Sequence, residues 1–163
     1  RFPLNSSPAV QGTDRREFQV EALPVRFTIE LPVERASALL RRVLEREGFI
    51  VAGEVQPEGE DPEGRPGSLA LYAYHGPTMQ AASRADRRVG LYMLCAVTIR
   101  PAGQGSSEIQ GVSPNQLAGV WGGRRLEQHA VAQRQHFERA LSRLEFDYAP
   151  AEAGSAQMRR RAA

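Results

Sequence analysis

Alternating apolar and polar side chains mark several short strands along the chain. Residues 25–31 (Val-Arg-Phe-Thr-Ile-Glu-Leu) alternate with a period of two, which is the pattern of a half-buried strand. The same reasoning predicts strands over residues 49–55, 69–74, 91–100 and 107–112, of which 91–100 is expected to be the longest. Residues 69–74 are apolar almost throughout, which favours a central place in a sheet.

Helical periodicity fills the spaces between these strands. Apolar residues recur on one helical face over residues 33–47, and Gly48 is the residue expected just past such a helix. A short helix is predicted over residues 77–89, because Pro77 suits a first helical turn. The longest helix is predicted over residues 124–148.

Two segments read as loops. Residues 57–68 are rich in proline, glycine and acidic side chains, so an exposed loop is expected there. Residues 119–123 contain three glycines around Trp121, whose side chain is expected to cover one end of the core. At the ends of the chain, we expect a flexible lead-in over residues 1–16 and a disordered, arginine-containing tail over residues 150–163.

The order of the predicted elements defines a fold class. It runs strand, helix, strand, strand, short helix, strand, strand, helix within a single domain over residues 17–149. Strand pairs joined by short connections favour antiparallel pairing. We therefore predict an α+β fold with a single mixed, mostly antiparallel sheet and with helices packed on one face.

Composition narrows the class of protein further. The 163 residues carry 21 basic side chains, all of them arginine, against 19 acidic ones, for a net charge of +2. No basic stripe with interleaved aromatics appears, which disfavours nucleic-acid binding. A single cysteine excludes an internal disulfide, and no apolar run is long enough to span a membrane. Because the chain opens with Arg1, we expect an exported or membrane-anchored soluble domain, such as one in the bacterial periplasm.

Three short motifs carry a family resemblance that extends over residues 25–145. They are Tyr74-His75-Gly76-Pro77, Gly90-Leu91-Tyr92-Met93-Leu94-Cys95 and Val112-Ser113-Pro114, preceded by the pair Gly48-Phe49. In these motifs and in its element order, the chain resembles the bacterial family catalogued as domain of unknown function three hundred and two. The resemblance implies an α+β sandwich, often in exported or redox-associated proteins. It implies no settled reaction.

Cys95 is the first candidate for chemistry. On the predicted strand it shares the more apolar face with Met93 and Val97, so it is expected to point at the core. A buried thiol is usually a small, inert hydrophobe, because burial suppresses the thiolate. A nucleophilic pair of Cys95 with His75 would instead require an exposed thiol in electropositive surroundings.

A ligand site is the alternative interpretation of the same region. His75 lies where the third strand meets the short helix, and it approaches Cys95 if the third and fourth strands are neighbours. Met79 and Met93 would add soft sulfur atoms, and such a set favours copper or haem iron. By contrast, His129 and His136 lie about 10 Å apart along the long helix and are expected at the surface.

These observations lead to three hypotheses about function, and none of them specifies a reaction. The first hypothesis is a small non-enzymatic binding domain whose ligand or protein partner occupies the sheet end near His75 and Cys95, with Met79 and Met93 beside them. The alternative is a metal- or haem-handling, redox-associated protein that uses the same four residues. A thiol-dependent enzyme is the third hypothesis, and no catalytic residue is assigned.

Overall fold

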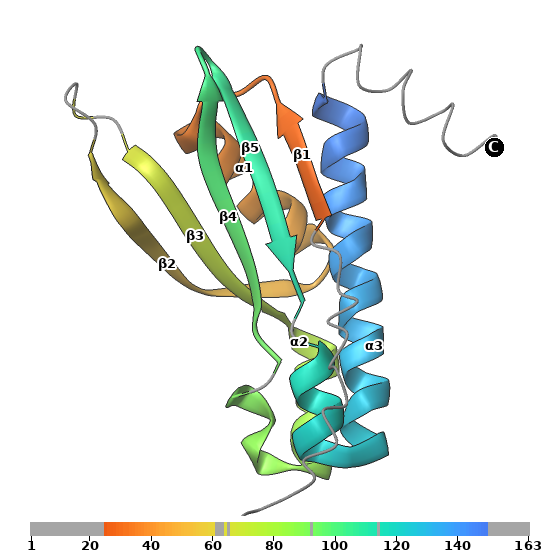
Figure 1. Ribbon diagram of the computed structural model, residues 1–163. Coiled ribbons are helices and arrows are strands. Elements are labelled where there is room, and N and C mark those ends of the chain that lie inside the picture. The colour runs from red at the N-terminus through yellow and green to blue at the C-terminus, as the bar shows by residue number, and fades with distance from the viewer. Residues whose placement is uncertain (1–24, 61–63, 65, 92, 114, 150–163) are drawn as a thin grey trace, which may run out of the picture.

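The described residues fold as one five-stranded sheet with three α-helices and one short 3-10 helix. The computed structural model describes residues 25–60, 64, 66–91, 93–113 and 115–149, so the expected lead-in and tail lie outside the described residues. The elements, labelled in Figure 1, are β1 (Val25–Ile29), α1 (Val33–Arg46), β2 (Phe49–Glu60), β3 (Pro66–His75), α2 (Gly76–Ala85), the 3-10 helix η1 (Arg87–Leu91), β4 (Cys95–Gly103), β5 (Ser106–Val112) and α3 (Asn115–Tyr148).

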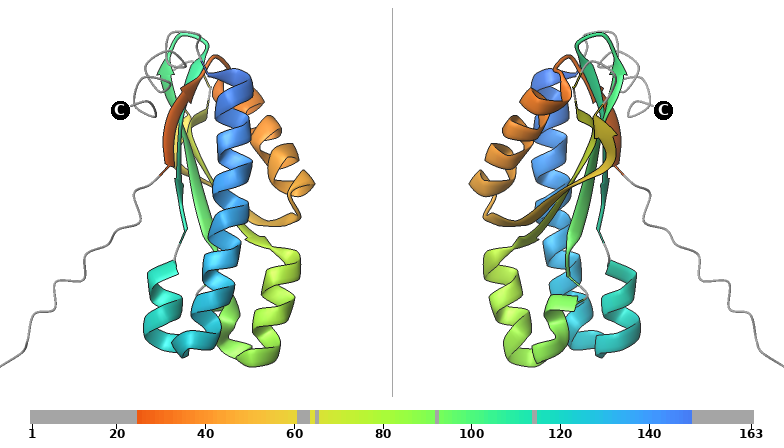
Figure 2. Two further views of the ribbon diagram at one scale, coloured as in Figure 1. Left: turned by 90° about the vertical axis from the view of Figure 1, so that its right-hand side faces the viewer. Right: turned by 90° about the vertical axis from the view of Figure 1, so that its left-hand side faces the viewer.

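The sheet confirms the predicted fold class. Its strand order is β1-β5-β4-β3-β2, and every neighbouring pair is antiparallel. Helices α1 and α3 lie against one face, which we call the inner face, while α2 lies beyond one end of the sheet (Figures 1 and 2). None of the described helices is both long and apolar enough to cross a membrane.

The fourth strand differs from the prediction. Residues 87–91 form η1, and β4 begins only at Cys95, so β2 is the longest strand. The turn into η1 is stabilised by Asp86, whose carboxylate accepts from the backbone N–H of Arg88 at 2.9 Å. Val89 and Met93 are then buried beneath α3, which is packing that the apolar run could not distinguish from a strand.

Both predicted loops are also largely regular structure. Most of residues 57–68 extends β2 and β3 into a long hairpin, in which a bulge precedes the pair Glu58 and Ser68. Backbone pairing therefore continues where side chains have little to bury; residues 61–63 and 65 lie outside the described residues. Residues 119–123 belong to α3, although each glycine in a helix costs about 1 kcal/mol relative to alanine. The predicted position of the Trp121 side chain, over one end of the core, lies outside what the structure describes.

The main core lies between the inner face and the two long helices. Alternate strand residues face inward, and α1 and α3 each contribute one apolar stripe. Its fully buried members are Ile29, Ala36, Leu40, Leu44, Leu71, Cys95, Val97, Ile99, Ile109, Leu141 and Leu144. The inward direction predicted for Cys95 is thereby confirmed.

A second, smaller apolar cluster lies below the sheet end. It joins α2, η1 and the first half of α3, and consists of Ala82, Val89, Met93, Leu126 and Ala130, with Met79 partly buried against it. Helix α3 contributes to both clusters, and the junction between them is where β3 ends at His75.

Candidate functional site

His75 is held by the local structure of its own segment. It ends β3 and is the N-cap of α2, where the ring takes the place of the usual short polar cap. Its Nδ1 accepts from the backbone N–H of Thr78 at 3.4 Å and lies 2.7 Å from the Thr78 hydroxyl. Pro77 in the first turn has no N–H to satisfy. The start of α2 is thus occupied by the chain itself.

The other side of the His75 ring faces the turn after α1. The Nε2 atom of the ring lies against Gly48. Burial lowers the pKa of His75 and the charge of His136 lowers it further, while the contacts with Glu47 act in the opposite direction. Because Nδ1 accepts from the N–H of Thr78, the proton of the neutral ring is carried by Nε2.

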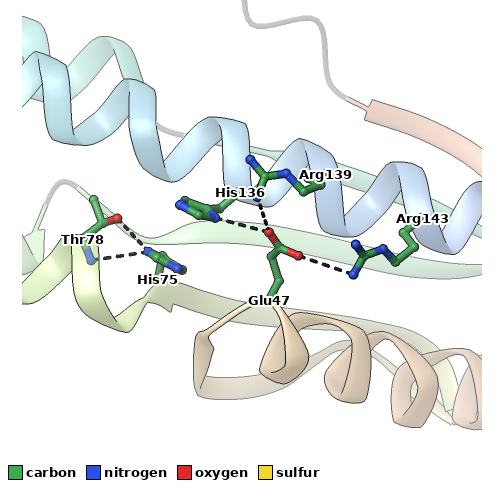
Figure 3. Close-up of polar contacts among 6 residues, drawn as sticks. All are labelled: Glu47, His75, Thr78, His136, Arg139 and Arg143. Carbon is green, nitrogen blue, oxygen red and sulfur yellow. Dashed lines mark hydrogen bonds and ion pairs between the residues drawn. The ribbon is translucent and has the colours of Figure 1, made fainter.

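His136 stacks on His75. The ring centroids are 3.9 Å apart and the ring planes are inclined by only 12° (Figure 3). His136 projects from α3, 61 residues further along the chain, and its side chain is half-buried. The expectation of an ordinary surface histidine is therefore wrong for His136, because α3 crosses directly over the end of β3.

Glu47 is the centre of a charged network at the same place. Its carboxylate accepts from Nη1 of Arg139 at 2.8 Å and lies 3.3 Å from Nδ1 of His136 and 3.6 Å from Nη1 of Arg143 (Figure 3). Burial raises the pKa of Glu47, but the hydrogen bonds of His136 and Arg139 and the charges of Arg139 and Arg143 outweigh it and hold the pKa below its usual value. The network therefore keeps a charged carboxylate under two arginines.

The exposure of this network is uneven. The Glu47 side chain is only 10% exposed, whereas those of Arg139 and Arg143 are 55% and 60% exposed. The acid is thus covered by the cations, and the surface seen by solvent is positive. We call Arg139 and Arg143, together with the His136 ring beside them, the cationic edge.

Gln133 connects the residues that sequence reasoning singled out. Its Oε1 accepts from the backbone N–H of His75 at 3.1 Å. Its Nε2 donates to the backbone carbonyl of Met93 and to Sγ of Cys95, the latter at 3.5 Å. In the sequence, the only sign of this bridge is that Gln133 is a polar residue within the otherwise apolar stripe of α3. His136 lies one helical turn after Gln133, so the same signal points to it as well.

The four predicted site residues are only partly brought together. Strands β3 and β4 are neighbours, as the hypothesis required, and Ala73, two residues before His75, pairs with Cys95. His75, Met93 and Cys95 all surround Gln133, while Met79 lies at the margin of the smaller cluster. Ligand binding by these residues stays a prediction.

Neither Cys95 nor His75 is placed for nucleophilic or metal-binding chemistry. Burial raises the pKa of the Cys95 thiol to about 11, although hydrogen bonds with Ser113 and Gln133 oppose it, so the thiol is protonated near neutral pH. Nδ1 of His75 is engaged within the chain by Thr78, and the His75 side chain is buried. Among the described residues, no group of three or more His, Cys, Asp or Glu side chains is arranged to hold a metal ion.

Gly48 allows the turn after α1 to approach His75, which leads to a testable prediction. Its φ is +91°, and an added Cβ would lie 2.9 Å from Nε2 of His75. We expect Gly48→Ala to lower the free energy of unfolding by about 2–4 kcal/mol, from the strained backbone and the displaced ring together. Gly105 also has a positive φ but open space around it, so Gly105→Ala measures the backbone strain alone. Equal losses in urea denaturation would contradict the contact with His75.

Comparison with known proteins identifies the fold and nothing finer. No family model matches the chain, and no curated protein sequence is significantly similar to it. A crystal structure described as the "uncharacterized conserved protein DUF302 from Bacillus stearothermophilus" superposes with a TM-score of 0.60 at 18% sequence identity. The match covers 75% of this chain and 98% of that chain. At this identity, the similarity shows a shared fold with a domain of unestablished role.

Proposed function

We propose that this chain belongs to the DUF302 family and is a small non-enzymatic binding domain, whose ligand or partner occupies the sheet end around His75 and Cys95. The family assignment is supported by the shared fold, which covers nearly all of the Bacillus protein. It is also supported by the residues on which the resemblance rests, since the motif at His75 and Pro77 begins α2.

One observation carries the non-enzymatic part of the proposal. His75 and Cys95, the groups best suited to chemistry, are both buried and hydrogen-bonded within the chain. A nucleophilic thiol needs a lowered pKa and access to solvent, and Cys95 has neither. A metal- or haem-handling function would have to expose the buried His75 ring, whose Nδ1 is hydrogen-bonded to Thr78, so the geometry favours binding by other groups.

The cationic edge supplies those groups. Arg139 and Arg143 face solvent, and each guanidinium has five N–H donors, more than one shared carboxylate uses. Arginine pairs well with carboxylate and phosphate oxygens. We therefore propose that the ligand presents an anionic group to this edge, while His75, Met79, Met93 and Cys95 form the packed support beneath it.

The proposal is tested by titrating the isotope-labelled protein with inorganic phosphate and following backbone and arginine side-chain NMR signals. We expect saturable shifts centred on His136, Arg139 and Arg143. Arg139→Gln should weaken binding about tenfold, because a charge-assisted pair is lost. Arg124→Gln removes an exposed charge from the same helix, away from the network, and serves as the matched control.

Three results would count against the proposal. Phosphate shifts spread evenly over the exposed arginines would indicate a general charge effect and no site. Equal affinity in the Arg139→Gln and Arg124→Gln variants would show that the cationic edge does not hold the anion. A Cys95→Ala variant should bind phosphate as the parent does; loss of binding there would move the site to the thiol.

A further inference from the structure

Two side chains of α3 share one oxygen atom of Glu47. Nη1 of Arg139 donates to Oε1 at 2.8 Å, and Nδ1 of His136 lies 3.3 Å from that same Oε1. Arg143 approaches the other oxygen, Oε2, at 3.6 Å (Figure 3). Because His136 and Arg139 use one acceptor, the charge on His136 affects how strongly Glu47 holds Arg139.

His136 is the member of this network whose charge changes near neutral pH. Imidazole is the one side chain whose ordinary titration falls between about pH 5 and 8, whereas a guanidinium stays charged throughout. The pKa of Glu47 is held below its usual value, so its carboxylate also stays charged over this range. A proton gained by the network near neutral pH therefore resides on a histidine.

Of the two stacked histidines, His136 is the one that takes the proton. The ring centroids are 3.9 Å apart, so positive charges on both rings would repel each other. His75 is buried, and this burial and the charge of His136 lower its pKa. His136 is half-buried and has the Glu47 carboxylate beside Nδ1, which stabilises an imidazolium.

The titratable and charged groups that face His136 come from three elements. Glu47 lies in the turn after α1, His75 ends β3, and Arg139 is one helical turn further along α3. Protonation of His136 adds one positive charge to two arginines that share a single carboxylate. Each arginine is then held less strongly by Glu47, and its N–H donors are more available to an anion from solvent.

We propose that anion binding at the cationic edge is coupled to protonation of His136. This inference rests on the proposed function and adds its regulation. Protonated His136 draws Oε1 of Glu47 away from Arg139, which turns its guanidinium to the anion. Binding is strong at acid pH and weakens as His136 loses its proton with rising pH. By linkage, a bound anion also makes His136 harder to deprotonate.

Sulfate is the probe for this coupling, because it stays a dianion over the range in which histidine titrates. At constant ionic strength, we expect the chain to bind sulfate about fivefold to tenfold more tightly at about pH 5.5 than at about pH 8. His136→Gln keeps a polar side chain but takes up no proton, so its affinity should be nearly the same at both pH values. His129→Gln is the matched control, because it replaces another half-buried histidine of α3, and it should keep the full pH response.

A second measurement needs no anion. In NMR spectra recorded without sulfate, the Nε–H signal of Arg139 should follow the titration of the His136 ring. The same signal should follow that titration in His129→Gln, and it should lose this dependence in His136→Gln. A signal of Arg139 that ignores the titration of His136 would overturn the coupling within the network.

The other outcomes separate this inference from the proposed function. Sulfate that binds at the cationic edge with equal affinity at both pH values would overturn the coupling and leave the anion site standing. A pH response that persists in His136→Gln, in protein whose circular dichroism matches the parent, would assign it to general charge and overturn the coupling as well. Absence of sulfate binding at either pH would refute the anion site itself, and the coupled binding with it.

Discussion

Replacing Phe137 by alanine is expected to lower the free energy of unfolding by about 3–5 kcal/mol. Phe137 is 1% exposed, and its ring lies 5.9 Å from that of Phe49. Together with Leu141 it fills the space over Gly111, where even one added carbon would collide with both side chains. The vacated volume is enclosed by the inner face and by both long helices, so little relaxation can close it.

The measurement is urea denaturation followed by far-ultraviolet circular dichroism. Phe146→Ala is the matched control: it removes the same ring from the same helix, but at a position that is 89% exposed. We expect that control to stay within about 0.5 kcal/mol of the parent protein. A loss below about 1 kcal/mol for Phe137→Ala would show that α3 is not packed on the sheet as described.

Gln133→Met is expected to lower the free energy of unfolding by about 2–6 kcal/mol, although it preserves an unbranched side chain of similar length. The substitution leaves the backbone N–H of His75 and the carbonyl of Met93 buried without their partner. An unsatisfied buried polar group costs about 1–3 kcal/mol, and two are created at once. Because Cys95 also loses a hydrogen bond, its surroundings should loosen.

Two measurements distinguish this effect from a general weakening of α3. Gln135→Met changes an exposed residue two positions along the same helix and should be nearly neutral in urea denaturation. The reaction of Cys95 with a thiol reagent should accelerate in Gln133→Met and remain slow in Gln135→Met. If both variants are equally stable, the bridge between His75 and Met93 contributes nothing.

Local pattern was sufficient for most of the fold. The alternation in residues 25–31 and the apolar stripe of residues 33–47 correspond to β1 and α1, with ends displaced by a residue or two. The failures occur where tertiary contacts decide the conformation. The residues just before Cys95, such as Val89 and Met93, are apolar because they pack under α3. A short apolar run does not by itself distinguish a strand from a helix.

For a related reason, only part of the candidate site could be predicted from the sequence. His75 could be found because it stands at a strand end before a proline-started helix, which is local information. The ion pair between Glu47 and His136 joins residues 89 positions apart, and it depends on how α3 crosses the end of α1. No spacing rule in the sequence relates those two helices, so the cationic edge becomes visible only in the folded chain.

The strand order has a kinetic consequence. Strands β2, β3, β4 and β5 pair in chain order, so four strands of the sheet can assemble through short-range closures. Strand β1 must wait for β5, since the pair Arg26 and Glu108 closes a loop of 82 residues, and α3 follows after that. Until both arrive, the sheet has apolar residues on each face. Long-range closures are slow, and an exposed sheet is prone to self-association. A nascent chain that pauses before α3 is synthesised would therefore be the form most in need of a chaperone.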